Sequence, residues 1–134
     1  MPGDAKSLRE FAERYTAAWC SGEAQSVARF FAPDATLTIN AGTPARGTSE
    51  IRETVQAFMT AFPDLRVRFD RLEPRDERFE YHWTLTGTNT GPGGSGRPVQ
   101  ISGFELWRLG DDGLIAASEG QFDAEEYRRQ VEGL

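Results

Sequence analysis

Glu105 is the residue of this sequence best placed for acid–base chemistry. It interrupts an apolar run, Gly103-Phe104-Glu105-Leu106-Trp107, which has the composition of a β-strand. Side chains alternate between the two faces of a strand, so Glu105 shares a face with Ile101, Gly103 and Trp107. On a cavity wall its carboxyl group would lose water and its pKa would rise, as suits a proton-transfer residue. The alternative is an outer sheet face, where Glu105 is solvated or paired with an arginine.

Tyr15 and Trp19 form a second pair of interest. They are four residues apart in a segment with helical periodicity, so they share one helix face. Each side chain has an apolar body and a polar tip. Such a pair suits the wall of a pocket with a wet end as well as a dry core, and the residues alone leave both interpretations open.

The sequence contains one histidine, His82, and one cysteine, Cys20. An unperturbed histidine titrates near neutral pH. Strand alternation nevertheless places His82 on the face opposite Tyr81 and Trp83, away from any cavity that those two line. A catalytic zinc site usually needs several nitrogen or sulfur ligands. We therefore expect no metal and no cofactor, and we expect Cys20 to pack rather than react.

The composition fits a globular enzyme or binding domain rather than a nucleic-acid or membrane protein. The 134 residues fit one domain, 1–134, and 38% hydrophobic content is enough for one core. The net charge is −6, whereas a protein that binds nucleic acid usually carries a basic surface patch. No apolar run approaches the roughly 18 residues of a membrane span, and the first ten residues do not resemble a signal peptide. We expect a cytoplasmic protein.

Hydrophobic periodicity predicts three helices in the N-terminal half and a short fourth helix at the C-terminal end. The predicted ranges are Asp4 to Cys20, Glu23 to Phe31, about Ser49 to Phe62, and Asp123 to Val131. Gly22 and Pro33 are expected to follow the first two helices. Thr48 or Ser49 is expected to cap the third, and Asp123 the fourth.

Alternating apolar and polar residues predict five strands. Their ranges are Ala35 to Asn40, Leu65 to Leu72, Phe79 to Thr90, Val99 to Leu109, and Leu114 to Phe122. Ala41 to Gly47 is expected to be a loop, and Gly91 to Gly96 a mobile tip over a pocket mouth. Consecutive strands with short connections predict an α+β fold with a curved, mainly antiparallel sheet and helices on one face. A cavity between them is a common ligand site.

Several segments, in this order and spacing, resemble a known superfamily. They are Tyr15-Thr16-Ala17-Ala18-Trp19, Phe31-Ala32-Pro33-Asp34-Ala35-Thr36, Ala61-Phe62-Pro63-Asp64-Leu65, Trp83-Thr84-Leu85-Thr86-Gly87, Gly96-Arg97-Pro98-Val99 and Asp111-Asp112-Gly113-Leu114-Ile115. The chain is similar to the nuclear-transport-factor-2-like superfamily of cone-shaped α+β proteins, and more narrowly to its SnoaL-like, polyketide-cyclase-like branch. The resemblance implies a fold that hosts isomerases, cyclases, dehydratases, epoxide hydrolases and plain binding modules.

The resemblance also suggests roles for single residues. Ketosteroid isomerases of this fold use a carboxylate base and an oxyanion hole made by a tyrosine and a protonated acid. Tyr15 stands near the place of that tyrosine and Glu105 near that acid, but Ile39 stands where the base would be. Polyketide cyclases rely on an aspartate and a histidine whose places fall near Gly120 and Trp107. A slip of one residue would bring Glu119 or Gln121 there instead.

From these points we predict a cofactor-free enzyme that cyclises, isomerises or dehydrates a hydrophobic, oxygenated small molecule such as a polyketide intermediate. Glu105 would move the proton and Tyr15 would donate a hydrogen bond to the developing oxyanion. The residues expected around the substrate are Trp19, Phe30, Asn40, Phe58, Met59, Phe62, Trp83, Trp107 and Gly120.

Two alternatives remain open at this stage. One is a non-catalytic ligand-binding or accessory module, and the other is an epoxide-opening hydrolase or cyclase that uses Glu105 with a second carboxylate. We also expect a homodimer that packs through the outer face of the sheet.

Overall fold

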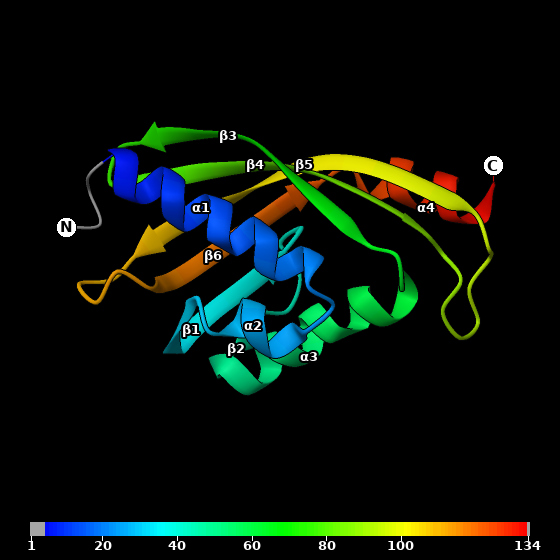
Figure 1. Ribbon diagram of the computed structural model, residues 1–134, viewed down its shortest axis with the longest axis horizontal. Coiled ribbons are helices and arrows are strands. Elements are labelled where there is room, and N and C mark those ends of the chain that lie inside the picture. Colours follow the sequence, from blue (N-terminus) through cyan, green and yellow to red (C-terminus); the bar gives the residue numbers. More distant parts are fainter. Residues whose placement is uncertain (1–4, 134) are drawn as a thin grey trace.

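A six-stranded sheet organises the chain in the computed structural model, which describes residues 5–133 (Figure 1). The strands are β1 (Phe31–Ile39), β2 (Ala45–Arg46), β3 (Arg66–Arg75), β4 (Arg78–Thr88), β5 (Pro98–Leu109) and β6 (Ile115–Phe122). They lie in the order β2-β1-β6-β5-β4-β3. All neighbours are antiparallel except β1 and β6, which are parallel. The prediction of an α+β fold with a mainly antiparallel sheet is confirmed.

Helices α1 (Ala5–Cys20), α2 (Ala24–Ala28) and α3 (Gly47–Ala61) cover one face of the curved sheet (Figure 1). Helix α4 (Ala124–Glu132) packs against β5. As predicted, the Asp123 side chain caps α4 by accepting a hydrogen bond from the Glu126 amide at 3.0 Å. Asp4, the predicted first residue of α1, lies outside the described residues.

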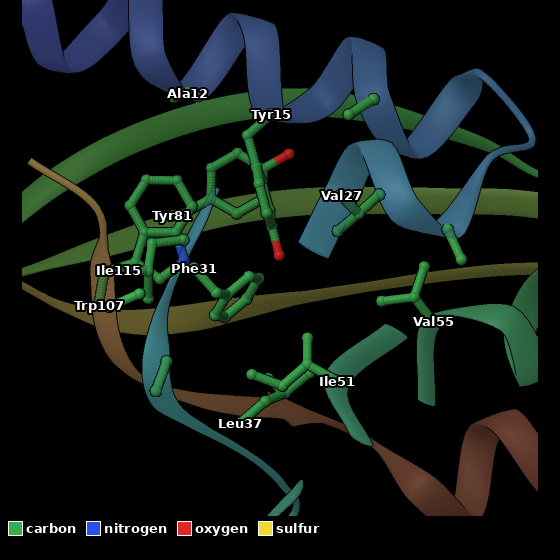
Figure 2. Packing of buried hydrophobic residues seen from close by; sticks show 14 of the residues in the cluster. Ala12, Tyr15, Val27, Phe31, Leu37, Ile51, Val55, Tyr81, Trp107 and Ile115 are labelled. Carbon is green, nitrogen blue, oxygen red and sulfur yellow. The ribbon is translucent and has the colours of Figure 1, made fainter. Parts of the chain in front are cut away.

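Three fully buried aromatic side chains join α1 to the inner face of the sheet (Figure 2). The rings of Tyr81 on β4 and Trp107 on β5 stack with their centroids 4.8 Å apart. Tyr15 of α1 meets both rings edge-on, at 5.3 Å and 5.1 Å. Edge-to-face and offset-stacked contacts are the favoured geometries for such rings, so this trio fixes where α1 lies on the sheet.

The second helix is shorter than predicted, and Phe31 is a strand residue. Phe31 begins β1 and pairs with Ile115, whose amide donates to the carbonyl of Phe30 at 2.9 Å. Pairing with β6 therefore outweighs the local helical pattern. Pro33 lies within β1 rather than ending a helix. The ladder to β6 is irregular between Phe31 and Thr36, which is where a strand can accept a residue without an amide hydrogen.

The segment expected to be a loop between β1 and α3 contains the two-residue strand β2, paired with β1. Helix α3 begins at Gly47, and its N-cap is Arg46 rather than Thr48 or Ser49. The Glu50 carboxylate reaches back and accepts from the Arg46 amide at 2.9 Å. This contact satisfies a backbone donor at the helix start without a hydroxyl cap.

Two irregularities set which side chains face inward. In the β5–β6 pair, Arg108 pairs with Ala117 but Leu109 pairs with Ile115, so Ala116 is the extra residue of a bulge. In the β3–β4 pair, Asp70 is extra in the same way, between Phe69 and Arg71. A bulge inserts one residue into one strand and changes the phase of everything beyond it.

The tip from Gly91 to Gly96 contributes no residue to the lining of the cavity described below. It is held against the C-terminal end of α3, where the Gly91 amide donates to the Ala61 carbonyl at 3.2 Å. The Asn89 side chain donates to the same carbonyl at 3.3 Å. These contacts anchor the β4–β5 connection away from the cavity.

Two glycines of the inner face offer a matched test of the packing. A Cβ on Gly103 would lie 2.2 Å from the Gln121 carbonyl oxygen and 2.8 Å from the Trp83 ring. We expect Gly103→Ala to lower the free energy of unfolding by about 1–3 kcal/mol, because backbone must move. A Cβ on Gly120 meets nothing closer than 3.7 Å. Gly120→Ala should change stability by less than about 0.5 kcal/mol. Urea denaturation measures both, and equal stabilities would contradict the geometry.

Candidate functional site

A cavity lies between the inner face of the sheet and helices α1, α3 and α4. Its volume is about 70 Å³, measured as the space open to the centre of a water molecule. One water needs roughly 10–15 Å³ of such space, so the cavity holds several waters or one small ligand. Six lining residues are aromatic, namely Trp19, Phe58, Tyr81, Trp83, Phe122 and Tyr127. The others are Leu37, Ile39, Thr54, Val67, Leu85, Ile101, Glu105 and Gly120.

Glu105 is the one carboxyl group in this lining, which among residues 5–133 contains no lysine, arginine or histidine. The residue is 8% exposed. Its Oε1 atom accepts three hydrogen bonds, from Ser118 Oγ at 2.8 Å, Trp107 Nε1 at 3.0 Å and the Tyr15 hydroxyl at 3.0 Å. Its Oε2 atom accepts only from Tyr15, also at 3.0 Å. Oε1 is therefore saturated, and Oε2 keeps lone-pair capacity for a ligand.

Opposing effects act on the proton of Glu105. Desolvation by burial raises the pKa of this carboxyl, and the hydrogen bonds from Trp107, Ser118 and Tyr15 lower it in part. The net result is a raised pKa. Burial also raises the pKa of Tyr15, and the negative charge of Glu105 raises it further. Tyr15 therefore remains a neutral donor while Glu105 titrates.

The structure brings Tyr15 and Glu105 together, but not as two groups that face a ligand side by side. Tyr15 is fully buried and is absent from the cavity lining. Its hydroxyl donates to both oxygens of Glu105. It thus positions the carboxyl group, and the expected oxyanion contact with a ligand has no support in this geometry.

Of the expected wall residues, Trp19, Phe58, Trp83 and Gly120 line the cavity. Asn40 does not, because its side-chain oxygen accepts from the Phe122 amide at 3.0 Å and so ties the end of β1 to β6. Asn40 adopts φ of 50°, as turn residues of this type do.

Four further expected wall residues belong to the packed core or pack against it instead. Met59 is on the turn of α3 that points into the main cluster, and Phe62 is fully buried in a second cluster with Leu85 and Val99. Trp107 is fully buried against Tyr81 and contributes its indole N–H to Glu105. Phe30 packs edge-on against Phe11 and Tyr15.

Sequence reasoning missed several contributors, among them Ser118, Phe122 and Tyr127. Ser118 donates to Glu105 from the neighbouring strand, which only the β5–β6 register reveals. Phe122 and Tyr127 line the cavity from the end of β6 and from α4. Their rings meet at 64° with centroids 5.6 Å apart. The signal available in the sequence was the position of these two aromatic residues, one directly before the Asp123 cap and one four residues after it.

The register shows where the residues that the family resemblance singled out lie in the sheet. Ile39 pairs with Gly120, Gly120 also pairs with Glu105, and both Ile39 and Gly120 line the cavity. No slip brings an adjacent polar residue inward. Glu119 is exposed and pairs with Arg78 at 3.4 Å, and Gln121 is exposed as well.

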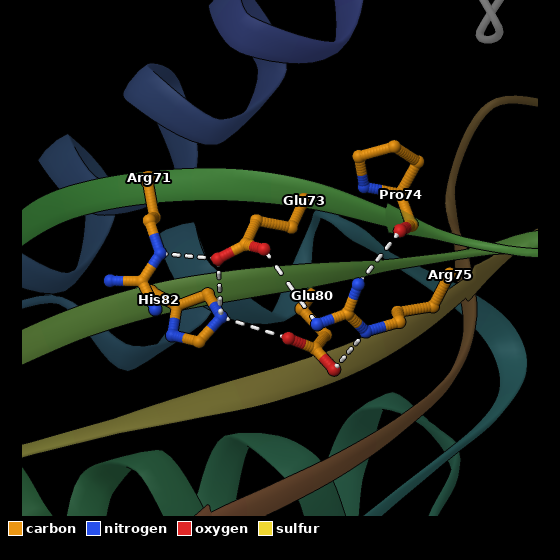
Figure 3. A network of polar contacts seen from close by, with 6 residues as sticks. All are labelled: Arg71, Glu73, Pro74, Arg75, Glu80 and His82. Carbon is orange, nitrogen blue, oxygen red and sulfur yellow. Dashed lines mark hydrogen bonds and ion pairs between the residues drawn. The ribbon is translucent and has the colours of Figure 1, made fainter.

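His82 lies on the outer face of the sheet, as alternation predicted, within an ion-pair network (Figure 3). Its Nε2 atom is 2.9 Å from Glu80 and 3.6 Å from Glu73. These three residues could hold a metal ion by distance alone. However, Arg71 pairs with Glu73, and Arg75 lies 2.9 Å from Glu80. The arginines already balance both carboxylates, so the group is best described as cross-strand pairing of β3 with β4.

Comparison with protein families supplies the classification. The model of the SnoaL-like domain matches residues 12–118. The chain belongs to the SnoaL-like family. The matched range of this SnoaL-like protein includes Tyr15, Glu105 and Ser118, so the hydrogen-bonded cluster lies inside the family domain. No functionally curated protein matches the sequence. Among the described residues, no helix combines the length and apolar character of a membrane span.

Solved structures share the fold of this SnoaL-like protein at low sequence identity. A protein of ketosteroid isomerase-like fold from Catenulispora acidiphila, in complex with trimethylamine, is 16% identical with a TM-score of 0.79, and 92% of each chain is covered. A candidate SnoaL-like polyketide cyclase from Jannaschia sp. CCS1 is 17% identical with a TM-score of 0.77, covering 93% and 94%. The epoxide hydrolase/cyclase-like enzyme SalBIII is 16% identical with a TM-score of 0.79, covering 94% and 97%.

The buried carboxyl predicts a specific pH dependence of stability. The folded protein holds the Glu105 proton to higher pH than the unfolded chain, whose glutamates titrate near pH 4.3. Stability from this group is therefore present below about pH 4.3 and is lost as the pH rises through the higher folded-state pKa. Glu105→Gln lacks this loss, so its free energy of unfolding should rise relative to the wild type as the pH increases above about 4.3.

Urea denaturation at several pH values measures this difference. Glu119→Gln, at an exposed position on the same sheet, is the matched control and should follow the wild-type profile. A constant difference between Glu105→Gln and the wild type across this range would contradict the assigned burial effect.

Proposed function

We propose that this SnoaL-like protein is a cofactor-free enzyme that transfers protons on a small, largely apolar, oxygenated molecule. The observation that carries the proposal is Glu105, a buried carboxyl group that lines a largely apolar cavity and whose Oε2 atom accepts only one hydrogen bond, from Tyr15. The raised pKa of Glu105 makes the carboxylate a stronger base than an exposed glutamate, and the same carboxyl group can then return the proton as an acid.

The proposed step uses the Oε2 atom of Glu105. It takes a proton from a carbon next to a substrate carbonyl, and the electrons of the broken C–H bond move toward the carbonyl oxygen to form an enolate. The carboxylic acid then returns its proton to the same or another atom. Oε1 remains bound to Ser118, Trp107 and Tyr15 throughout, so the carboxyl group does not reorient. Isomerisation, dehydration and ring closure can each begin with such a step.

The similar structures support a small-molecule role. One is a candidate polyketide cyclase, one is an epoxide hydrolase/cyclase-like enzyme, and one holds a small amine. Opening an epoxide with paired carboxylates has less support here, since Glu105 has no second carboxylate beside it in the lining formed by the described residues.

A non-catalytic binding module is the second candidate. Ile39 and Gly120 favour it, because both line the cavity, neither can transfer a proton, and the family resemblance leads us to expect reactive groups near these positions. A binding module would keep the cavity and the Glu105 cluster without turning over a substrate.

Deuterium exchange separates these two candidates without knowledge of the natural substrate. We expect the wild type to exchange the α-hydrogens of 2-indanone or 2-tetralone with D₂O faster than buffer alone does. Proton NMR measures this exchange as the loss of the α-hydrogen signal. Glu105→Gln should lose at least about 100-fold of that acceleration, and Glu119→Gln should keep it. Exchange that is equal in wild type and Glu105→Gln would leave the binding module as the function.

Tyr15→Phe tests the positioning role of the tyrosine. The change keeps the ring packing and removes one donor to Glu105, which favours the ionised form. The pKa of Glu105 should rise further, so the rising limb of the exchange rate against pH should move to higher pH. At pH values above this limb, where Glu105 is ionised again, the variant should reach the maximum exchange rate of the wild type. A uniform loss of rate at every pH would instead indicate that Tyr15 contacts the substrate.

A further inference from the structure

We propose that the cavity selects a small organic cation, a tertiary or quaternary ammonium group, with Glu105 as its counter-ion. The inference rests on the proposed function in using the same cavity and the same carboxyl group. It adds the charge of the ligand, which neither the fold nor the family assigns.

The first step concerns charge. Among residues 5–133, the ion pairs are formed by other acidic residues, and Glu105 takes part in none of them. Its protein partners are two hydroxyl groups and an indole N–H, all neutral. An unpaired carboxylate in a dry site either takes up a proton or needs a cation. A ligand can supply the positive charge that the protein does not.

The second step concerns the walls. The aromatic lining comes from α1, α3, α4 and two strands, β4 and β6, and neighbouring rings stand at steep angles to one another. Trp19 and Phe58 meet at 68°, and Trp83 and Phe122 meet at 66°. Rings inclined in this way can present π-faces to one ligand from several directions. A cation over the face of an aromatic ring is attracted by the ring quadrupole, and this attraction is stronger in a desolvated site than at an exposed one.

The third step concerns the remaining polar groups. Tyr81 also lines the cavity near Glu105, but burial raises its pKa well above the usual value, and its hydroxyl bonds to Thr16 at 2.5 Å. Burial likewise raises the pKa of Tyr127 on α4. Both phenols therefore stay neutral, and Glu105 supplies the one charge of the lining. An anionic ligand would meet repulsion with no compensating cation.

Three probes of nearly equal shape test charge selection. They are choline, its neutral carbon analogue 3,3-dimethylbutan-1-ol, and the anion 3,3-dimethylbutanoate. Quenching of tryptophan fluorescence is a suitable readout, because Trp19 and Trp83 line the cavity. We expect choline to bind at least about 10-fold more tightly than the alcohol at pH 8 in phosphate buffer, and the anion more weakly than either. Equal or tighter binding of the alcohol would overturn the proposal.

Glu105→Gln assigns the selectivity to the carboxylate. The variant should bind the alcohol as the wild type does and lose the preference for choline to within about threefold, while Glu119→Gln keeps it. Retention of the full preference in Glu105→Gln would overturn the counter-ion role. If Glu105→Gln does not fold, wild-type titrations at several pH values replace it. Choline should then bind more tightly as Glu105 ionises with rising pH, and the alcohol should not, whereas pH-independent choline binding would overturn the proposal.

The two proposals fail separately. Deuterium exchange without a preference for choline would refute cation selection and leave proton transfer standing. A preference for choline without exchange on any ketone would refute proton transfer and leave a cation-binding module.

Discussion

The central constraint on this structure is the burial of one carboxyl group. A carboxylate removed from water is costly unless hydrogen bonds replace the lost hydration. Glu105 receives them from α1, from its own strand and from β6, through Tyr15, Trp107 and Ser118. These three elements must therefore be held in fixed relation. The stacked and edge-on rings of Tyr15, Tyr81 and Trp107 supply that rigidity, so the aromatic core and the polar cluster depend on each other.

The cavity lies where two packed regions meet. One cluster surrounds Tyr15 and Trp107, and the other surrounds Phe62 and Leu85. Trp19 and Trp83 border both clusters and also line the cavity. Dense packing on either side allows space between them to persist without collapse. Some residues, such as Tyr81 and Leu85, belong to the packed clusters and also line the cavity.

The sequence predicted the elements that carry strong periodicity, together with the pairing of Tyr15 with Glu105 that the family resemblance suggested. It misplaced Phe31, because a contact with Ile115 more than 80 residues away decides that segment. It counted Met59, Phe62 and Trp107 as cavity walls, because an apolar residue on an inward face can line a cavity or fill a core. It missed Ser118, because a donor on a neighbouring strand becomes visible only with the register. The local sequence pattern indicates which face of a helix or strand points inward, and the long-range pairing of strands decides which side chains become neighbours.

The bulge at Ala116 gives this register its significance. With Leu109 opposite Ile115 and no extra residue, Glu105 would lie opposite Glu119 rather than Gly120, and Trp107 opposite Ala117 rather than Ser118. One inserted residue thus replaces a clash of two acids with a small residue and a hydroxyl. In evolutionary terms, the chemistry of this cavity depends on chain length as well as on residue identity. A single-codon insertion or deletion near the β5–β6 turn would change in one event which β6 residues lie opposite position 105 in a related protein.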